Sequence, residues 1–516
     1  MNQYEYDVAV IGAGFGGLGA ALKLSEAGLR VGLVEALNYP GGCASTFKRR
    51  GYAFESGATL FSGFAEGMYF DDLIKRYSMP VTIDWIDPLV EMRTPSWSLP
   101  VGRSRRDLLQ QLIDLGVPKV PLQAFFKEQR QVADTLWALF DDPDLLPPFN
   151  LKSILTHLRN VPQYTKLLSY VGRSLHQVLA RHQLHDSEPL VTFLNALCQI
   201  TIQTDIYTAE APFALATMDY YFRGTGHVRH GIGALATAMV DAFKENGGTM
   251  HYTTRVKEIS REHDGWHLTT NKRPIRARRV IGNLLPQAAE KLCPLLSTSR
   301  TQGLKNRLDD GWGAAMLYFV VKHTDRLPDK ALHVEAVQDV SSPFMEGNHI
   351  FASLSGLADE GRAPEGERTL TVSTHIPFRK YQAMTDDERA TYIQRVQETM
   401  QETLRSRAPE LIEETVLCMP ASPRTFERFT KRPLGRVGGV PRKVGLHHYL
   451  SINPMQVAKD FYLVGDSAFP GQSTLACALG GNRAGTALLR SLDQRKLLPA
   501  IPQPVEHQTS APQHSP

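Results

Sequence analysis

Three glycines and one glutamate near the N-terminus stand at fixed spacings between two apolar runs. Gly12, Gly14 and Gly17 form G-x-G-x-x-G directly after the apolar segment 7–11. Gly12 allows a tight turn, Gly14 lets the backbone approach a pyrophosphate, and Gly17 lets the following helix pack closely on the strand. Glu35 ends the second apolar run, placed to accept a hydrogen bond from a ribose 2′-hydroxyl. The spacing therefore predicts a dinucleotide site.

The elements that must position these residues are a strand, a helix and a second strand within about 30 residues. Segment 7–11 reads as a buried parallel strand, 16–27 as the helix and 31–34 as the second strand. The helix N-terminus, with Phe15 and Gly16, directs its amide groups and the positive end of its dipole at the phosphates.

A second pair of glycines follows soon after Glu35. Gly41 and Gly42, followed by Ser45 and Thr46, give the backbone a second close approach to a long cofactor. A plain nicotinamide site does not need this second approach. An ordinary turn is the alternative interpretation. Further along, Gly57 ends a short strand and turn at 52–57, and is expected near a flavin.

The segment 461–492 carries the last motif. A strand at 461–464 is capped by Gly465 and Asp466, whose carboxylate can bind a ribitol hydroxyl. Gln472, Ser473 and Thr474 then begin a long helix, whose N-terminal dipole can stabilise the negative charge of a reduced flavin. A plain strand–turn–helix unit is the alternative.

Composition narrows the class of protein. The 516 residues suffice for two or three domains with sizeable cores, and a net charge of +4 offers no case for nucleic-acid binding. Five scattered cysteines with no C-x-x-C pair indicate neither disulfides nor a zinc site, and no metal cluster stands out.

The first strand starts close to Met1, which leaves no room for a signal peptide, and no run of 18 apolar residues occurs. A cytoplasmic protein is expected.

Residues 100–220 look helical. Within them, 145–185 contains no acidic residue but five Lys or Arg, interleaved with apolar residues mostly at helical spacing. A basic amphipathic segment suits peripheral contact with an anionic membrane. A helix pair packed on the core with a solvated basic face is an equally weighted alternative.

The remaining segments alternate between helix and strand. The chain is expected to return to the nucleotide domain with a helix at 234–244 and strands at 249–256 and 278–283. In that domain, Val256 is expected to offer a backbone contact to an adenine. Residues 291–440 are expected to form a mixed sheet with one helix at 386–405. The composition of 496–516 predicts a disordered tail.

Taken together, the motifs resemble those of the flavin amine-oxidase superfamily, and of its branch of phytoene desaturases, carotenoid isomerases and retinol saturases. The residues that carry the resemblance are the N-terminal motif with Glu35, PGG at 40–42, RHGIGAL at 229–235 and GDSAFPGQS at 465–473. In this family the segment at 229–231 usually carries a glycine pair, and here His230 replaces the first glycine. His227 lies in the same loop, near where family members place the flavin face. Both histidines are candidates for catalysis.

The resemblance implies an α/β protein with FAD as cofactor: a discontinuous Rossmann-type, GR2-like FAD-binding domain, a mixed-sheet substrate domain and a helical membrane-contacting insertion. The substrate would be a long apolar polyene or isoprenoid, on which the enzyme performs desaturation, saturation or cis–trans isomerisation by hydride transfer through flavin N5. The expected divisions are FAD-binding parts at 1–99, 221–290 and 441–495, the helical region at 100–220, the substrate domain at 291–440 and the tail at 496–516.

Two other functions remain open on the sequence. A flavin amine oxidase would need an aromatic cage and a polar amine entrance, which the sequence does not locate. A non-catalytic prenyl-binding escort of the GDP-dissociation-inhibitor type shares the fold, but the intact Glu35, Gly41, Gly42 and Asp466 argue against it. Cys477 could hold flavin covalently, although a buried helix cysteine is the favoured interpretation. The sequence defines no oligomeric state.

Overall fold

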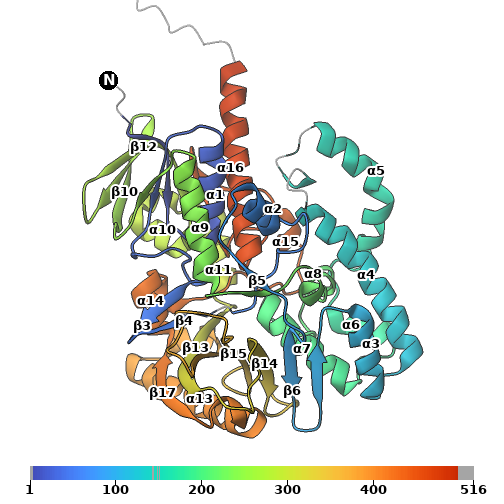
Figure 1. Cartoon of the computed structure of the whole chain (residues 1–516). Coiled ribbons are helices and arrows are strands. Elements are labelled where there is room, and N and C mark those ends of the chain that lie inside the picture. Colours follow the sequence, from blue (N-terminus) through green and yellow to red (C-terminus); the bar gives the residue numbers. More distant parts are fainter. Residues whose placement is uncertain (1–3, 58, 142–144, 148, 150, 498–516) are drawn as a thin grey trace, which may run out of the picture.

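The chain folds around two sheets that lie at opposite ends of the molecule, with a helical region beside them (Figure 1). The computed structural model describes residues 4–57, 59–141, 145–147, 149 and 151–497. The predicted tail at 496–516 lies outside these residues except for its first two positions, which end the last helix. None of the helices within the described ranges is long and apolar enough to cross a membrane.

The first sheet contains eight strands among the described residues, in the order β10-β11-β12-β1-β2-β9, with β19 also paired to β12 and β18 paired to β19. Strands β19, β12, β1, β2 and β9 run parallel, so their carboxyl ends meet at one edge. The strands are β1 (Tyr6–Ile11), β2 (Val31–Val34), β9 (Thr249–His251), β10 (Val256–Glu262), β11 (Gly265–Thr270), β12 (Ile275–Gly282), β18 (Met455–Ala458) and β19 (Phe461–Leu463).

Helices from both ends and from the middle of the chain pack together against this sheet. They are α1 (Phe15–Glu26), α9 (Ile232–Glu245), α16 (Thr474–Leu497) and, nearby, α2 (Tyr69–Arg76). The contact between α1 and α16 is close because Gly481 has no side chain: a Cβ there would lie 1.9 Å from the carbonyl oxygen of Gly16. The two flanking motifs of the sequence are thus held side by side.

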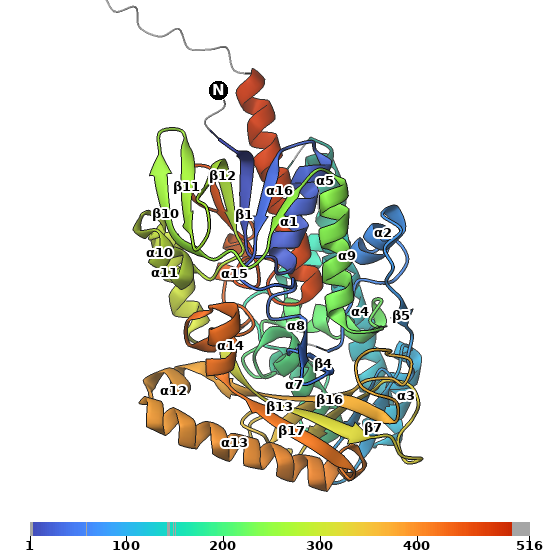
Figure 2. The same cartoon turned by 60° about the vertical axis from the view of Figure 1, so that its left-hand side comes forward.

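The second sheet has the order β17-β13-β16-β15-β14-β6-β7 and is mixed, since only β14 and β6 are parallel. Alternate residues of β13 face α13 (Asp386–Arg407), which runs beneath the sheet in Figure 2, and the others face the interior. The strands are β6 (Val90–Arg93), β7 (Ser98–Val101), β13 (Trp312–Lys322), β14 (Leu332–Val337), β15 (His349–Leu354), β16 (Glu367–Pro377) and β17 (Thr415–Ala421).

The helical region has its own core, to which most of its helices contribute leucine, phenylalanine and alanine side chains. Its helices are α3 (Arg105–Asp114), α4 (Lys119–Asp141), α5 (Leu151–Leu168), α6 (Leu175–Arg181), α7 (Glu188–Ile202) and α8 (Ala211–Thr217). Helix α5 stands away from the two sheets at the upper right of Figure 1.

Short elements connect these parts. Two short antiparallel pairs are formed by β3 (Thr46–Arg49) with β4 (Tyr52–Glu55), which make a hairpin, and by β5 (Ile83–Asp84) with β8 (His227–Val228), which are far apart in the sequence. The short helices are α10 (Pro286–Leu292), α11 (Ser299–Leu308), α12 (Phe378–Ala383), α14 (Pro423–Thr430) and α15 (His447–Leu450).

Most of the strands and helices expected from the sequence are confirmed, but three differ. The strand predicted at 249–256 is wrong: β9 ends at His251, and the chain turns before β10 begins at the far edge of the sheet. Residues of high strand propensity continue through the turn, so the pattern does not mark it. The region 291–440 contains several short helices besides the expected one. Strands β6 and β7 fall within or beside the range 1–99, yet they pair into the second sheet.

Candidate active site

A large cavity begins at the carboxyl edge of the parallel strands. The residues that follow β1, β2, β12 and β19 all line it: Gly12, Glu35, Asn283 and Gly465. Its volume is about 1350 Å³. Ordinary small-molecule pockets measure roughly 300–1,000 Å³, so this cavity has room for a dinucleotide and for a second molecule.

Glu35 is held rigidly at the end of β2. One carboxylate oxygen accepts a hydrogen bond of 2.8 Å from the N–H of Ala13, and the other accepts one of 2.8 Å from the N–H of Leu37. Burial raises the pKa of the Glu35 carboxyl, and these backbone N–H groups act against that shift. Each oxygen retains a lone pair, and the side chain lines the cavity. This arrangement fits the carboxylate expected to bind a ribose hydroxyl.

The glycines of the two N-terminal motifs form one backbone cradle. Gly14 and Gly41 are bridged as parallel neighbours, and the N–H of Gly41 donates to the carbonyl oxygen of Ala13 at 2.8 Å. A Cβ on Gly14 would lie 2.5 Å from Nδ2 of Asn283. The N-terminus of α1 opens onto this cradle. Bare backbone at a helix N-terminus is the surface that a pyrophosphate requires, so the residues present fit a dinucleotide.

The C-terminal motif completes the opposite wall. Asp466 accepts a hydrogen bond of 2.7 Å from the guanidinium of Arg432. Burial raises the pKa of Asp466, and the positive charge of Arg432 opposes the rise. Gln472 donates to the carbonyl oxygen of Ile200 at 3.0 Å and accepts from Gln203 at 2.6 Å. The hydroxyl of Ser473 accepts from the N–H of Ala476 at 3.1 Å, which caps α16.

Most of the residues predicted to bind the cofactor line the cavity. These are Gly12, Gly14, Phe15, Gly16, Glu35, Gly41, Gly42, Gly57, Val256, Gly465, Asp466, Gln472, Ser473 and Thr474. Gly17, Ser45 and Thr46 do not line it. Gly17 instead packs against the carbonyl oxygen of Gly12, and Thr46 donates to Glu55 at 3.0 Å. These three residues support the turns that carry the lining residues.

Asn283, Arg432 and Thr59 also line the cavity, and the sequence reasoning did not single them out. Asn283 had a usable signal, because it directly follows a short buried strand, and ligands bind at the carboxyl ends of parallel strands. Arg432 and Thr59 had none, since both lie in irregular segments.

The far half of the cavity is an apolar chamber. Its walls come from the helical region and from the interior face of the second sheet, and include Phe61, Trp137, Phe140, Phe213, Met316 and Phe351. His375 lies in this wall, stacked on Trp312 with ring centroids 3.6 Å apart. Burial, together with the nearby His349, lowers the pKa of His375 to about 3, so its imidazole is neutral at physiological pH.

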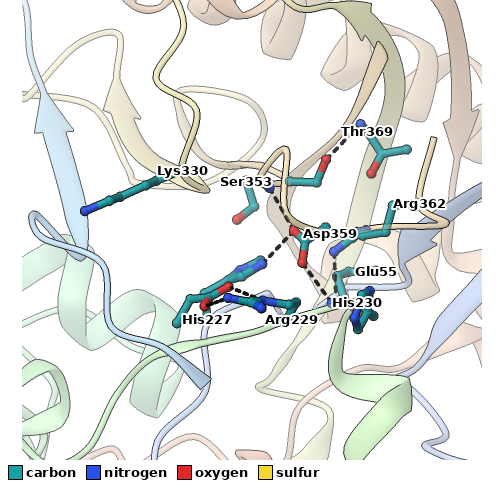
Figure 3. A network of polar contacts seen from close by, with 12 residues as sticks. Glu55, His227, Arg229, His230, Lys330, Ser353, Asp359, Arg362 and Thr369 are labelled. Carbon is teal, nitrogen blue, oxygen red and sulfur yellow. Dashed lines mark hydrogen bonds and ion pairs between the residues drawn. The ribbon is translucent and has the colours of Figure 1, made fainter. Parts of the chain in front are cut away.

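The two histidines suggested for catalysis are not among the residues that line the cavity. His227 is buried, and its Nε2 lies 2.8 Å from a carboxylate oxygen of Asp359. His230 is exposed and adopts the left-handed backbone conformation that glycine favours, with φ of +65°. Its N–H donates to Asp359 at 2.8 Å, so both histidines converge on one carboxylate (Figure 3).

Cys477 does line the cavity, at the start of α16. Its thiol lies 3.6 Å from the carbonyl oxygen of Gly471. Burial raises the pKa of this thiol well above its ordinary value, with Asp466 adding to the rise. A protonated thiol is a poor nucleophile, which favours non-covalent binding of the cofactor.

Comparisons with known proteins agree with this geometry. A family model described as flavin-containing amine oxidoreductase matches residues 15–418. The chain is 25% identical to prolycopene isomerase 1, chloroplastic, of an Oncidium hybrid cultivar, over 96% of this chain and 86% of the relative. It is 24% identical to the phytoene desaturase (neurosporene-forming) of Cereibacter sphaeroides, over 90% of each chain.

Two solved structures share the fold. An oxidoreductase from Methanosarcina mazei superposes with a TM-score of 0.60 at 18% identity, over 94% of this chain and 99% of the other. Putrescine oxidase bound to putrescine superposes with a TM-score of 0.58 at 16% identity, over 94% and 99%. The chain therefore belongs to the flavin-containing amine oxidoreductase family, in which it resembles the branch of carotenoid isomerases and desaturases, and it is an FAD-dependent enzyme.

Proposed function

We propose that the enzyme acts on C–C bonds of a long apolar polyene of the carotenoid type, by desaturation, saturation or cis–trans isomerisation. The observation that carries the proposal is the continuity of the cavity: one space of about 1350 Å³ joins the dinucleotide cradle to the apolar chamber. The names of the relatives, prolycopene isomerase and phytoene desaturase, support the same class of substrate.

The residues of the chain have distinct tasks in this reaction. The chemistry that bound FAD would supply is hydride transfer at its N5. Glu35 and the glycine cradle hold the nucleotide half, and the N-terminus of α16 faces the flavin end of the cavity. The aromatic and aliphatic walls exclude water and align the polyene, so that a C–C bond lies beside the flavin.

An amine substrate is the competing possibility, and the charges of the cavity argue against it. Among the described residues that line the cavity, the carboxylates are those of Glu35, Glu427 and Asp466. Glu35 and Asp466 belong to the cofactor wall, and Glu427 lies beside the Arg428 and Arg432 segment. The described chamber wall therefore offers an ammonium ion no carboxylate partner, which favours an uncharged substrate.

We further propose that helix α5 docks on the membrane in which the polyene dissolves. Six of its apolar side chains are exposed, a large number for one 18-residue helix: Leu151, Ile154, Leu155, Leu158, Val161 and Leu168. Lys152, Arg159 and Lys166 are exposed at intervals of seven residues, which places them along one flank of that stripe. An apolar stripe with a basic flank is the pattern of an interfacial helix.

Among the described residues of the predicted basic segment 145–185, only α5 has this character. Helix α6 buries Leu175, Val178 and Leu179 in the core of the helical region. The segment thus contains an exposed amphipathic helix, α5, followed by a helix packed on the core, α6.

The position of α5 also supports a route for the substrate. Trp137 and Phe140 line the large cavity and also a neighbouring cavity of about 330 Å³, whose wall includes Leu146 and Pro147. Helix α5 begins four residues after Pro147. A polyene leaving a bilayer beside α5 would therefore meet the aromatic end of the chamber.

The proposed reaction is tested by incubating the purified holoenzyme with cis-configured and saturated carotenoid precursors in liposomes. A product that differs in mass by two hydrogens means a redox reaction, and a product of equal mass with a changed absorption spectrum means isomerisation. The matched variant Ala216→Phe fills the chamber wall without touching the cradle. It should retain flavin and lose turnover. Unchanged polyene with the wild type, together with oxidation of amines, would contradict the proposal.

A further inference from the structure

A chain of buried polar side chains leads from the cavity wall into the second sheet. Thr59 lines the cavity. The hydroxyl of Ser353 on β15 donates to Oγ1 of Thr59 at 2.6 Å. The oxygen of Ser353 lies 2.7 Å from Nδ1 of His333, its cross-strand neighbour on β14. All three side chains are more than nine-tenths buried. Buried polar groups are costly unless they are paired, so this continuous chain is a specific feature.

The direction of the hydrogen bonds follows from the number of protons. A serine hydroxyl has one proton, and that of Ser353 is donated to Thr59. Ser353 must therefore accept from His333, which carries its proton on Nδ1 and a lone pair on Nε2. Because Thr59 accepts from Ser353, its own proton points elsewhere, and the side chain borders the cavity. Every donor in the chain is thus directed toward the cavity.

The inner end of the chain lies beside a buried histidine–aspartate pair. The ring centroids of His333 and His227 are 5.7 Å apart. Nε2 of His333 and Nδ1 of His227 have no hydrogen-bond partner among the described residues. His227 in turn contacts Asp359 (Figure 3), and 2.8 Å separates Nε2 of His227 from a carboxylate oxygen of Asp359. Burial raises the pKa of Asp359, but the hydrogen bond and charge of His227 and the charge of Arg362 outweigh that effect and hold it well below its ordinary value. Asp359 is therefore ionised, and it accepts a hydrogen bond from the Nε2–H of His227.

We propose that Thr59, Ser353 and His333 are a proton relay that delivers a proton from the His227–Asp359 pair to the reacting molecules in the cavity. Thr59 gives its proton to an acceptor in the cavity and takes that of Ser353, Ser353 takes the Nδ1 proton of His333, and His333 takes a proton at Nε2 from Nδ1 of His227. This last step needs the two rings, whose centroids are 5.7 Å apart, to approach each other, because neither nitrogen has a hydrogen-bond partner among the described residues. One proton moves and no electrons do. His227 ends neutral, and His333 ends as its Nε2–H tautomer.

The relay matches a need of the proposed function, on which it rests for its substrate. Adding or removing two hydrogens at a C–C bond moves a hydride and also a proton, and the flavin N5 carries only the hydride. The wall of the chamber is largely aromatic and aliphatic, so a chain of polar side chains that reaches the cavity would supply the path that the proton needs. Burial and the neighbouring His227 lower the pKa of His333 to about 3, so this histidine passes protons without holding a charge.

A first experiment needs no substrate, and so its result is independent of the proposed function. Nuclear magnetic resonance of the holoenzyme with ¹⁵N-labelled histidine reports the tautomer of each ring, and His333→Asn assigns the signal. We expect His333 to be neutral and protonated on Nδ1 between pH 6 and 8. Ser353→Ala should shift it toward the Nε2–H tautomer, whereas the matched control Ser355→Ala should not. A charged His333, or one protonated on Nε2 in the wild type, would overturn the relay.

A second experiment measures turnover of the polyene. The matched control is Ser355→Ala. Ser355 is a buried serine two residues from Ser353, and its hydroxyl accepts a hydrogen bond from the backbone N–H of Thr369 instead of joining the relay, so this variant also loses one buried hydroxyl. Ser353→Ala should lower kcat on the order of 10²-fold with flavin content and KM unchanged, and Ser355→Ala should lower neither. Added imidazole should restore part of the activity of His333→Ala. Wild-type kcat in Ser353→Ala, or failure of every small proton donor to rescue His333→Ala, would overturn the proposal.

Discussion

At the scale of single residues, the cofactor site depends on glycines, which have no side chain to fill it, as much as on the side chains that line it. Glu35 supplies a fixed carboxylate, and Asn283 lies against Gly14 and Gly16 between the two flanking motifs. A side chain at either glycine would enter this space. The cost is steric rather than conformational, since neither glycine has a positive φ.

Gly14→Val should abolish flavin binding, because its branched side chain would occupy the pyrophosphate position and displace Asn283. The ratio of flavin to protein absorbance after purification measures the effect, and we expect at least a tenfold loss, equivalent to about 1.4 kcal/mol. Gly303→Val is the matched control, since a Cβ at Gly303 meets only the end of Arg307 at 3.6 Å. Normal flavin content in Gly14→Val would show that the cradle has been assigned wrongly.

His333 should make the stability of the fold depend on pH. Its pKa is lowered from 6.5 to about 3 by burial and by His227. Below pH 6.5 the unfolded chain therefore binds a proton that the folded protein does not. The contribution of His333 is complete above pH 6.5 and is lost as the pH falls toward 3.

Urea unfolding between pH 7 and pH 4 compares the wild type with His333→Gln. The free energy of unfolding of the wild type should fall more steeply with decreasing pH, by up to about 1.4 kcal/mol per pH unit. Parallel curves would mean that His333 titrates alike in both states.

At the scale of elements, two helices have opposite roles. Helix α16 is packed against α1 through glycine contacts, and it brings the C-terminal motif to the N-terminal cradle. Helix α5 has an exposed apolar stripe and a basic flank. Such a helix gains stability when a surface covers it, since burial of each large aliphatic side chain is worth about 1.5–3 kcal/mol.

The apolar stripe and the basic flank of α5 should make separable contributions to membrane binding. In flotation with anionic liposomes, changing Lys152, Arg159 and Lys166 to Gln, together with Arg173 in the turn after α5, should remove the salt-sensitive part, at about 1 kcal/mol for each residue near the surface. Changing Leu155 and Leu158 to Gln should remove the part that high salt leaves intact.

Two controls accompany this experiment. Arg181, which is paired with Glu128 on α4, provides a charge control as Arg181→Gln and should float like the wild type. If the wild type does not float even at low salt, α5 is covered in some other way, and the polyene reaches the chamber by another route.

At the scale of the whole molecule, the cofactor site is assembled from segments that are distant in sequence. Its walls come from near residues 11–62, 254–257, 283–292, 426–442 and 465–479. A ligand that contacts all of them holds the first sheet, α16 and the segment that follows β17 together. Binding energy that is available only in the assembled state adds to stability.

FAD should therefore stabilise the whole fold. Removing it should lower Tm, and adding it back at about one hundred times Kd should restore roughly 2.7 kcal/mol. Differential scanning calorimetry of apoprotein and holoprotein measures this change, with Gly14→Val as a variant that should not respond. An equal Tm in both forms would show that the flavin contacts one segment only.

Part of this organisation was determined by the sequence itself. Local spacing was sufficient for the strand–glycine–helix unit ending in Glu35, for the strand and helix around Asp466, and for the mixed character of the second sheet. These signals are local because turns, helix starts and buried strands depend on residues close together in the chain. The same holds for the basic amphipathic pattern at 145–185, although the sequence could not tell which part of it is exposed.

Tertiary structure alone decided which residues meet. Asn283 touches both flanking motifs because β12 runs between β1 and β19 in the sheet, a neighbourhood that no spacing in the sequence encodes. His227 and His230 were candidates for catalysis by their place in a motif, yet the fold turns both toward Asp359, some 130 residues away, and leaves the cavity wall to Thr59 and His375. The physical reason is that side-chain partners across packed sheets are selected by strand order and register, which depend on the whole chain.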